Sequence, residues 1–201
     1  MNERLDLMVD IETLGNEMNS TIIQLACVPF DIETGAIYED ETFNEIADIE
    51  KNETALEVSA STLKWWLETD KELFTRLLNS GSLSTEGIIR LFHRQVKEWQ
   101  SRVGIKNVYL WGNGILFDNQ MIKCQMEAIG LYYPIPYKND RDVRTILELA
   151  SAKSGVSERE IKDKLGNGVN DHNAINDVLY QINYVSECYR YLTSNTEELG
   201  E

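Results

Sequence analysis

Two acidic residues, Asp10 and Glu12, are separated by one position in the otherwise apolar segment Leu5-Asp-Leu-Met-Val-Asp-Ile-Glu-Thr13. Side chains alternate between the faces of a β-strand, so a strand here would place both carboxylates on one face. Burying two like charges is costly, and a divalent cation between them would relieve both their repulsion and their desolvation. The alternative is a strand whose acidic face is open to water. The pair alone does not decide between these interpretations.

Three further residues from distant parts of the sequence could complete a metal site. Asp118 follows an apolar segment and a glycine-containing turn, at an expected strand-to-helix junction, where α/β sheets place their chemistry. A helix N-cap is an equally good role for it. Asp177 lies within an apolar helical pattern, where a carboxylate needs a partner. His172 lies about 140° away from it on an ideal helix, which favours the loop or first turn before that helix.

The segments around these residues predict an α/β fold. Strands are expected over 5–13, 21–30, about 36–44 and 107–111, the first three as an antiparallel meander. Helices are expected over 61–67, 70–78, 118–129 and 142–153, after Ser84 and Ser157, and from near Asp171 to about Tyr189. This order indicates a mixed sheet flanked by helices in a single domain over 1–193, followed by a flexible acidic tail over 194–201.

The composition limits the possible functions. The 201-residue chain is 42% hydrophobic and has a formal net charge of −15, so it is not expected to coat long stretches of nucleic acid. It could still hold a few terminal nucleotides through metal ions. No apolar run approaches the roughly 20 residues that cross a bilayer, and no signal peptide is recognisable, so a cytoplasmic protein without membrane contact is expected. Three widely separated cysteines predict free thiols.

Together these residues resemble the DEDDh group of the DnaQ-like 3′→5′ exonucleases, within the ribonuclease H-like fold. The match consists of Asp10-x-Glu12-Thr13, Asp118 at the start of a middle helix, and His172-x-Ala174-x-x-Asp177. Other segments resemble the phage exonuclease A branch, related to the ribonuclease T family: Ser61-Thr-Leu-Lys-Trp-Trp66, Gly112-Asn-Gly-x-x-Phe-Asp118 and Arg141-Asp-Val-Arg-Thr145. The resemblance implies a mixed five-stranded sheet whose first three strands are antiparallel. The chain departs from the family in lacking a convincing basic patch.

The resemblance also implies a mechanism. Two Mg²⁺ or Mn²⁺ ions would be held by Asp10, Glu12, Asp118 and Asp177, and His172 would accept a proton from the attacking water. These five residues are the expected catalytic set. The expected reaction releases nucleoside 5′-monophosphates from the 3′ end of a single strand, with DNA favoured, in a bacterial or phage-infected cell. A homodimer is a further expectation.

Five residues are expected to contact the terminal nucleotide: Thr13, Leu14, Met18, Trp66 and Phe117. Aromatic rings give stacking affinity that tolerates any base. Adjacent side chains on a helix point in different directions, so one of Trp65 and Trp66 is expected in the core and the other near substrate. Arg141 and Arg144 are expected to pair with Asp142 in preference to binding phosphate.

Other classes of function remain open. A catalytically silent binding module could have the same fold. A structural interaction protein could direct its acidity at basic partners, but this gives no reason for carboxylates inside apolar segments. Within the enzyme class, the alternative is an exoribonuclease that trims RNA ends, because contact with a 2′-hydroxyl has no reliable linear signature.

Overall fold

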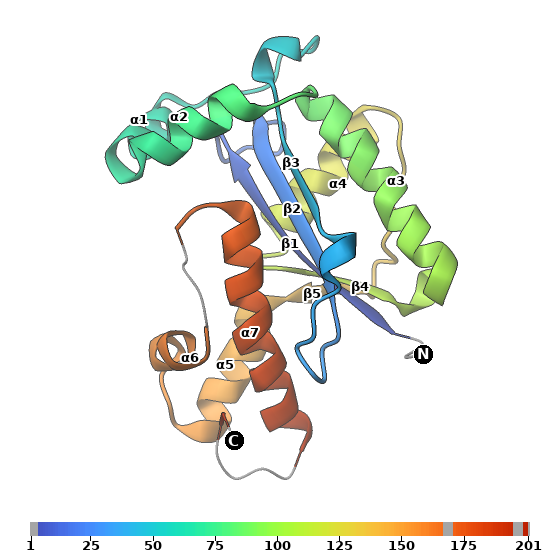
Figure 1. The fold of residues 1–201 in the computed structure, drawn as a ribbon, viewed down its shortest axis with the longest axis vertical. Coiled ribbons are helices and arrows are strands. Elements are labelled where there is room, and N and C mark those ends of the chain that lie inside the picture. The colour runs from blue at the N-terminus through green and yellow to red at the C-terminus, as the bar shows by residue number, and fades with distance from the viewer. Residues whose placement is uncertain (1–3, 167–170, 195–198, 201) are drawn as a thin grey trace.

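A mixed five-stranded sheet organises the chain (Figure 1). The computed structural model describes residues 4–166, 171–194 and 199–200. The strands are β1 (Leu5–Thr13), β2 (Ile22–Phe30), β3 (Phe43–Ile46), β4 (Val108–Gly112) and β5 (Asp140–Asp142), in the spatial order β3-β2-β1-β4-β5. β2 is antiparallel to both β1 and β3, whereas β4 is parallel to β1 and β5 is parallel to β4. This confirms the expected sheet and its antiparallel first three strands.

Helices cover both faces and one end of this sheet. They are α1 (Ala60–Thr69), α2 (Lys71–Ser80), α3 (Thr85–Val103), α4 (Asp118–Ala128), α5 (Val143–Ser154), α6 (Glu158–Leu165) and α7 (Ala174–Thr193). In Figure 1, α3 and α4 lie on one side of the sheet and α5 and α7 on the other, while α1 and α2 lie beyond one end. The side chains of Ser84 and Ser157 cap α3 and α6, as their sequence positions predict.

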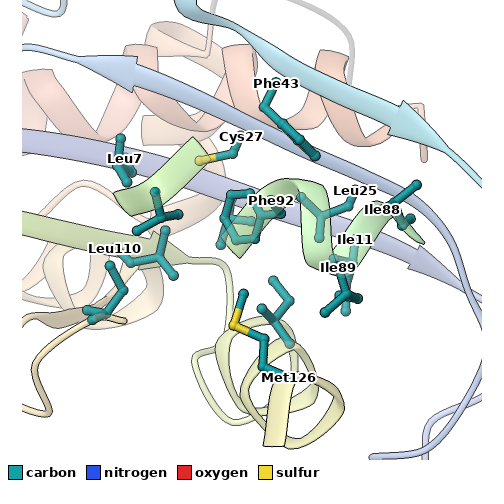
Figure 2. Close-up of a cluster of buried hydrophobic side chains, with 14 of the residues drawn as sticks. Leu7, Ile11, Leu25, Cys27, Phe43, Ile88, Ile89, Phe92, Leu110 and Met126 are labelled. Carbon is teal, nitrogen blue, oxygen red and sulfur yellow. The ribbon is translucent and has the colours of Figure 1, made fainter. Parts of the chain in front are cut away.

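The alternation of side chains along β1 explains which helices meet the acidic residues. Odd-numbered residues such as Leu7 and Ile11 pack in the core beneath α3 and α4, with Phe92 and Met126 (Figure 2). Even-numbered residues face the opposite side, where Met8 belongs to the core formed with α5 and α7. Asp6, Asp10 and Glu12 have the same parity as Met8, so β1 presents its acids to the face that α7 covers.

Three element boundaries differ from the sequence expectation. The third strand was expected over 36–44 and is restricted to Phe43–Ile46, because Glu39–Glu41 form an exposed, acidic 3-10 turn. The three-residue β5 was not located from the sequence, because Asp-Arg-Asp has no alternation of apolar and polar residues. It joins the sheet by pairing its backbone with β4. The last helix begins at Ala174, after His172 adopts a left-handed backbone with φ 59°.

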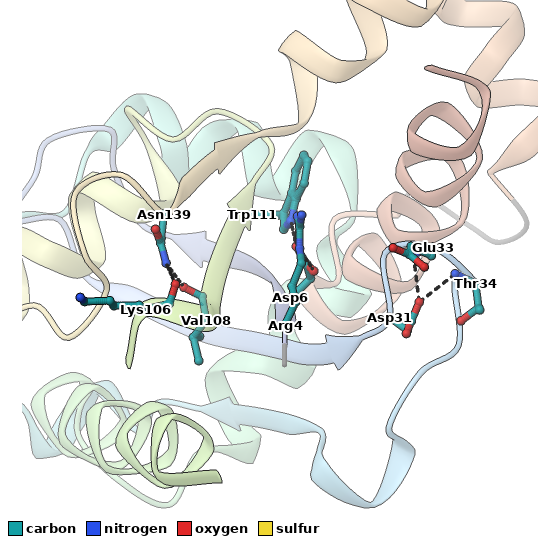
Figure 3. Close-up of polar contacts among 9 residues, drawn as sticks. All are labelled: Arg4, Asp6, Asp31, Glu33, Thr34, Lys106, Val108, Trp111 and Asn139. Atoms are coloured by element: carbon teal, nitrogen blue, oxygen red, sulfur yellow. Dashed lines mark hydrogen bonds and ion pairs between the residues drawn. The ribbon is translucent and has the colours of Figure 1, made fainter. Parts of the chain in front are cut away.

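Polar side chains fix the ends of the strands (Figure 3). Arg4 donates to both carboxylate oxygens of Asp6, and the indole N–H of Trp111 donates to Asp6 Oδ1 at 2.7 Å. Asn139 Nδ2 donates to the carbonyls of Lys106 and Val108, which ties the approach to β5 to the start of β4. In the turn after β2, Asp31 Oδ1 accepts the backbone N–H groups of Glu33 and Thr34.

The end of the chain is partly packed. Leu199, within the segment expected to be a flexible tail, is buried among apolar residues, and its carbonyl accepts a hydrogen bond from Lys164. Residues 195–198 and 201 of that tail lie outside the described part of the chain. The three cysteines are free, as expected. Among the described helices, none combines the length and apolar character needed to span a bilayer.

Candidate active site

Three carboxylates converge at the C-terminal end of β1. Asp10, Glu12 and Asp177 each place one oxygen within 4.8 Å of the others. Asp10 and Glu12 come from the same face of β1, and Asp177 comes from the first turn of α7, which packs on that face. Clustered carboxylate oxygens are the ligands that hard divalent cations such as Mg²⁺ prefer.

Asp118 lies next to this cluster and is buried. It is the first residue of α4, and Phe117 occupies the N-cap, so the alternative of an N-cap role for Asp118 is wrong. Its carboxylate accepts the backbone N–H groups of Asp118 itself and of Ile11 in β1. After burial, its negative charge is the next cause that raises the pKa of Asp10, so the two carboxylates repel each other. The structure thus brings all four predicted acids to one region.

The acids have unfavourable surroundings for four negative charges. Burial raises the pKa of Asp10 well above its ordinary value, and repulsion from Asp118 and Asp177 adds to this. Burial, followed by the charge of Asp10, raises the pKa of Glu12 in the same direction. Desolvation also raises the pKa of Asp118 to about 7 and that of Asp177 to about 6. A bound divalent cation would remove this repulsion, so the donor set and its electrostatics both fit a metal.

Neutral polar residues hold the acids in place. Gln181 Nε2, one turn after Asp177 on α7, donates to Asp10 Oδ1 at 3.2 Å. The backbone N–H of Asp171 donates to Asp177 Oδ1 at 3.1 Å. Gln24 of β2 accepts the N–H of Ala174 with Oε1, which fixes the start of α7 against the sheet. Sequence reasoning missed both glutamines, although an amide inside an apolar strand or on the buried face of a helix was a usable signal.

His172 lies in the loop before α7, as its spacing from Asp177 predicts. Its backbone N–H is hydrogen-bonded to the Asp177 carboxylate. Its ring centroid is 4.8 Å from that of Trp65, with the rings at 81° in an edge-to-face contact. The imidazole of His172 therefore extends from the loop before α7 to α1, where it contacts Trp65.

A cleft of about 530 Å³ adjoins the acids. Its lining comes from the end of β1, from α1 and from the residue before Asp118: Ile11, Glu12, Thr13, Asn16, Ser61, Thr62, Trp65, Trp66 and Phe117. The two tryptophans divide as expected, one in the core and one at the cleft, but Trp66 is the buried one. It is 1% exposed and donates its indole N–H to the Thr13 carbonyl, whereas Trp65 is 41% exposed. Both tryptophans line the cleft, but Trp65 has the more exposed ring, and the expected contact of Trp66 with substrate stays a prediction.

Of the other four residues that were expected to contact substrate, two line the cleft and two do not. Phe117 is partly exposed at the cleft, and Thr13 also lines it, although the Thr13 hydroxyl donates to the Gly15 carbonyl. Leu14 is buried in a small core with Trp66, so its side chain faces away from the cleft. Met18 lines a separate, apolar cleft together with residues of α3 and α4. Neither Leu14 nor Met18 lines the cleft at Trp65, and their expected contacts with the terminal nucleotide stay predictions.

Comparison with solved structures shows a nuclease fold. Cell-death related nuclease 4 (CRN-4) superimposes with a TM-score of 0.67 at 15% identity, over 90% of this chain and 62% of that one. The nuclease domain of 3′hExo, described as a DEDDh family member bound to rAMP, gives a TM-score of 0.61 at 14% identity over 98% and 96% of the two chains. The E. coli ExoI–ssDNA complex gives 0.60 at 13% identity over 89% of this chain and 39% of that one. The chain thus spans less than two thirds of CRN-4 and ExoI.

The family follows from the sequence itself. Residues 5–189 match the model of the 3′-5′ exoribonuclease Rv2179c-like domain, and the chain belongs to that family. No curated protein matches the sequence. The family match confirms the predicted membership of a 3′-5′ exonuclease family, and the chain shares its fold with a nuclease domain that is described as a DEDDh family member. The closer resemblance to the phage exonuclease A and ribonuclease T branch stays a prediction.

Proposed function

We propose that this protein removes nucleoside 5′-monophosphates from the 3′ end of single-stranded RNA, with two divalent cations and with His172 as general base. The observation that carries the proposal is the cluster of Asp10, Glu12 and Asp177 carboxylates within 4.8 Å of one another, beside a cleft with an exposed tryptophan. The family description, an exoribonuclease domain, supports RNA. DNA, which the sequence analysis favoured, is the second candidate, because a structure with the same fold is described as an ssDNA complex.

The cations would be held by Asp10, Glu12 and Asp177, with Asp118 contributing from the start of α4. When bound, a pair of such ions would stabilise the attacking and the departing oxygens of the phosphate. Gln181 and the Asp171 N–H orient the carboxylates of Asp10 and Asp177 beforehand, so little reorganisation is needed when substrate arrives.

His172 would accept the proton of the attacking water. An imidazole can accept and release a proton, which suits a general base. Its backbone N–H is bonded to the Asp177 carboxylate, and the edge of Trp65 restricts its ring. Both contacts keep the imidazole near the phosphate that the acids would hold.

The terminal base would enter the cleft between Trp65 and Phe117. Stacking on an aromatic ring contributes about 1–3 kcal/mol per base and does not depend on base identity. Trp65 is the exposed ring in this cleft, and it also contacts His172, so the terminal base and the proposed general base share one aromatic neighbour. The expected homodimer and cytoplasmic location stay predictions.

Matched RNA and DNA strands, labelled at the 5′ or the 3′ end, test this proposal. With Mg²⁺ or Mn²⁺, we expect a 3′ label to leave as a mononucleotide and a 5′ label to give a ladder that shortens with time. RNA should be degraded faster, and EDTA should stop both reactions. Faster degradation of DNA would favour the second candidate. Release of mononucleotides from the 5′ end, internal cuts or resistance to EDTA would contradict the proposal.

The role of His172 has its own test. His172→Ala should lower kcat by about 10²- to 10⁴-fold, the usual contribution of a general base, while KM stays within a few-fold. Asn173→Ala, at the next residue of the same loop, is the matched control for disturbance of the loop. An equal loss in both variants would assign the effect to loop structure and not to proton transfer.

A further inference from the structure

A second cleft lies beside the acids, between the loop that follows β4 and the helices α5 and α6. Its volume is about 550 Å³. Its lining is polar and charged: Asn113, Arg144, Thr145, Glu148, Glu158 and Lys162. It shares no residue with the cleft at Trp65, and it contains no aromatic side chain. Such a lining suits a charged backbone better than a nucleobase.

Arg144 connects this cleft to the carboxylates. Its guanidinium lies against Gly114, where a Cβ atom would be 3.4 Å from the guanidinium carbon. Gly114 has φ 125°, a backbone conformation that a residue with a side chain rarely adopts. The positive charge of Arg144 also lowers the pKa of Asp118. The guanidinium therefore stands between the metal-ligand region and the second cleft.

Both cations of the cleft are unpaired among the described residues. The structure shows no ion pair and no side-chain hydrogen bond for the Arg144 guanidinium or the Lys162 ammonium, although Glu148 and Glu158 line the same cleft. Asp142, the expected partner of Arg144, instead caps α5 through Thr145 N–H and accepts Ile115 N–H. The expected pairing of Arg144 with Asp142 is therefore wrong.

Arg141 behaves differently from Arg144. Its guanidinium lies 4.7 Å from the ring centroid of Tyr109 and donates to the carbonyls of Lys138 and Asp140. Arg141 is thus used to hold β5 in place. Of the two arginines of the Arg141–Thr145 segment, only Arg144 has a guanidinium free to bind a ligand, and Lys162 lines the same cleft.

We propose that this second cleft binds the phosphates of the substrate strand upstream, on the 5′ side, of the phosphate that is cleaved. Arg144 and Lys162 are the phosphate contacts. This inference rests on the proposed exonuclease function. It answers a difficulty raised by the sequence: a chain with a net charge of −15 repels nucleic acid as a whole, so affinity for a strand must come from local cations. Phosphate contacts position a strand without reading its sequence.

The experiment compares a strand with a substrate that has no strand upstream. The two substrates are an oligonucleotide of about eight residues and the nitrophenyl ester of a nucleoside 5′-monophosphate. The ester reports on the carboxylate site alone. The variants are Lys162→Gln and Arg144→Gln, with Arg159→Gln as the matched control. Arg159 lies on α6 like Lys162, but it is highly exposed, lies 3.7 Å from Asp163 and does not line the cleft.

We expect Lys162→Gln to raise KM for the oligonucleotide, relative to KM for the ester, by roughly 5- to 10-fold. The slope of log KM against log salt concentration should fall by about 0.7, the value for one lost phosphate contact to a single strand. Arg144→Gln should have a similar or larger effect. Glu158→Gln should act in the opposite direction, because it removes an acid from the same cleft. Arg159→Gln should leave both substrates unaffected.

Three results would overturn the inference. Equal effects of Lys162→Gln on the ester and the oligonucleotide would place Lys162 at the carboxylate site. Weaker inhibition by nucleoside 5′-monophosphate, with an unchanged oligonucleotide KM, would show that the cleft holds the product phosphate. Equal effects of Arg159→Gln and Lys162→Gln would reduce the cleft to general surface charge. If the wild-type protein hydrolyses neither substrate, the proposed function is wrong. The cleft can then still be tested by measuring, with fluorescence anisotropy in EDTA, how tightly each variant binds a labelled strand.

Discussion

The two halves of β1 treat buried acids in opposite ways. Asp6, in the first half, is 1% exposed and is held by Arg4 and by the indole N–H of Trp111. Asp10, four residues later on the same face, has a single neutral donor among the described side chains, Gln181, and otherwise faces Asp118 and Asp177. Both are aspartates in an apolar strand. Among the residues that the structure describes, only Asp6 has a partner of opposite charge.

The comparison shows that partners, and not burial, separate a structural acid from a functional one. A buried carboxylate that is paired within the protein has its charge compensated at all times. Carboxylates that face each other are compensated only when a cation arrives. Burial, and after it the repulsion between neighbouring carboxylates, raises the pKa values of Asp10 and Glu12. The partners of Asp6 therefore serve the fold, whereas the acids in the second half of β1 form the cluster that we propose to bind metal.

The strongest test of this contrast exchanges one acid at each end. Asp10→Asn should lower kcat/KM by at least about 10³-fold, because it removes a metal ligand, while leaving the circular dichroism spectrum and the unfolding midpoint of the metal-free protein nearly unchanged or raised. The matched variant Asp6→Asn should keep its kcat/KM within about twofold. Comparable losses of activity in the two variants would contradict the division of β1 into a structural and a functional half.

In the metal-free protein, the cost of burying the clustered carboxylates in their charged form should appear in the pH dependence of stability. In the folded protein the pKa values are raised to about 7 for Asp118 and about 6 for Asp177, above those of an unfolded chain. The folded state then binds more protons than the unfolded state between about pH 4 and pH 7, so the free energy of unfolding falls as pH rises through this window. Thermal unfolding in EDTA should show this fall, and saturating Mn²⁺ should remove it above pH 7. If the thermal unfolding midpoint in EDTA instead rises with pH between about pH 4 and pH 7, the charged carboxylates do not destabilise the folded protein.

At the structural end, Asp6→Asn should cost stability in place of activity. The amide keeps an acceptor for the Trp111 N–H, but the two hydrogen bonds from Arg4 lose their charged acceptor. A loss of about 1–3 kcal/mol is expected, which corresponds to a fall in Tm of roughly 2–10 °C for a chain of this length. Arg4→Gln should give a similar loss, and the double variant should give less than the sum. Strictly additive effects would show that the two residues do not interact.

The sequence predicted most of the fold because its strands and long helices carry clear periodicities. The run from Leu5 to Thr13 and the apolar stripe of α3 are of this kind. Two short polar strands were harder. β5 contains only Asp140–Asp142, and β3 covers four residues after an acidic turn, so both depend on pairing with neighbours that lie far away in the sequence.

For the candidate site, the acids could be predicted and their surroundings could not. Asp10, Glu12 and Asp177 were found because each interrupts an apolar pattern. Which tryptophan has an exposed ring depends on tertiary packing, because the indole N–H of Trp66 donates to the Thr13 carbonyl and Trp66 is buried. The free guanidinium of Arg144 likewise depends on Asp142 being used as a helix cap. Which partner a side chain takes depends on residues that are distant in the sequence and meet only in the folded protein.

The smallest expected effect concerns Asp177, the residue of α7 that joins the acids at the C-terminal end of β1. Asp177→Asn keeps the side-chain oxygen that accepts the Asp171 N–H and removes one negative charge from the cluster. In EDTA at pH 8 we expect Tm to rise by roughly 2–6 °C, since relief of about 1–2 kcal/mol of repulsion is a small change for a chain of this length. At pH 4 the same variant should match the wild type, because Asp177 is then largely protonated in the folded protein. Saturating Mn²⁺ should reverse the order at pH 8, because the wild type alone keeps the full ligand set. A variant less stable than the wild type in EDTA at pH 8 would mean that Asp177, like Asp6, is compensated by the protein itself.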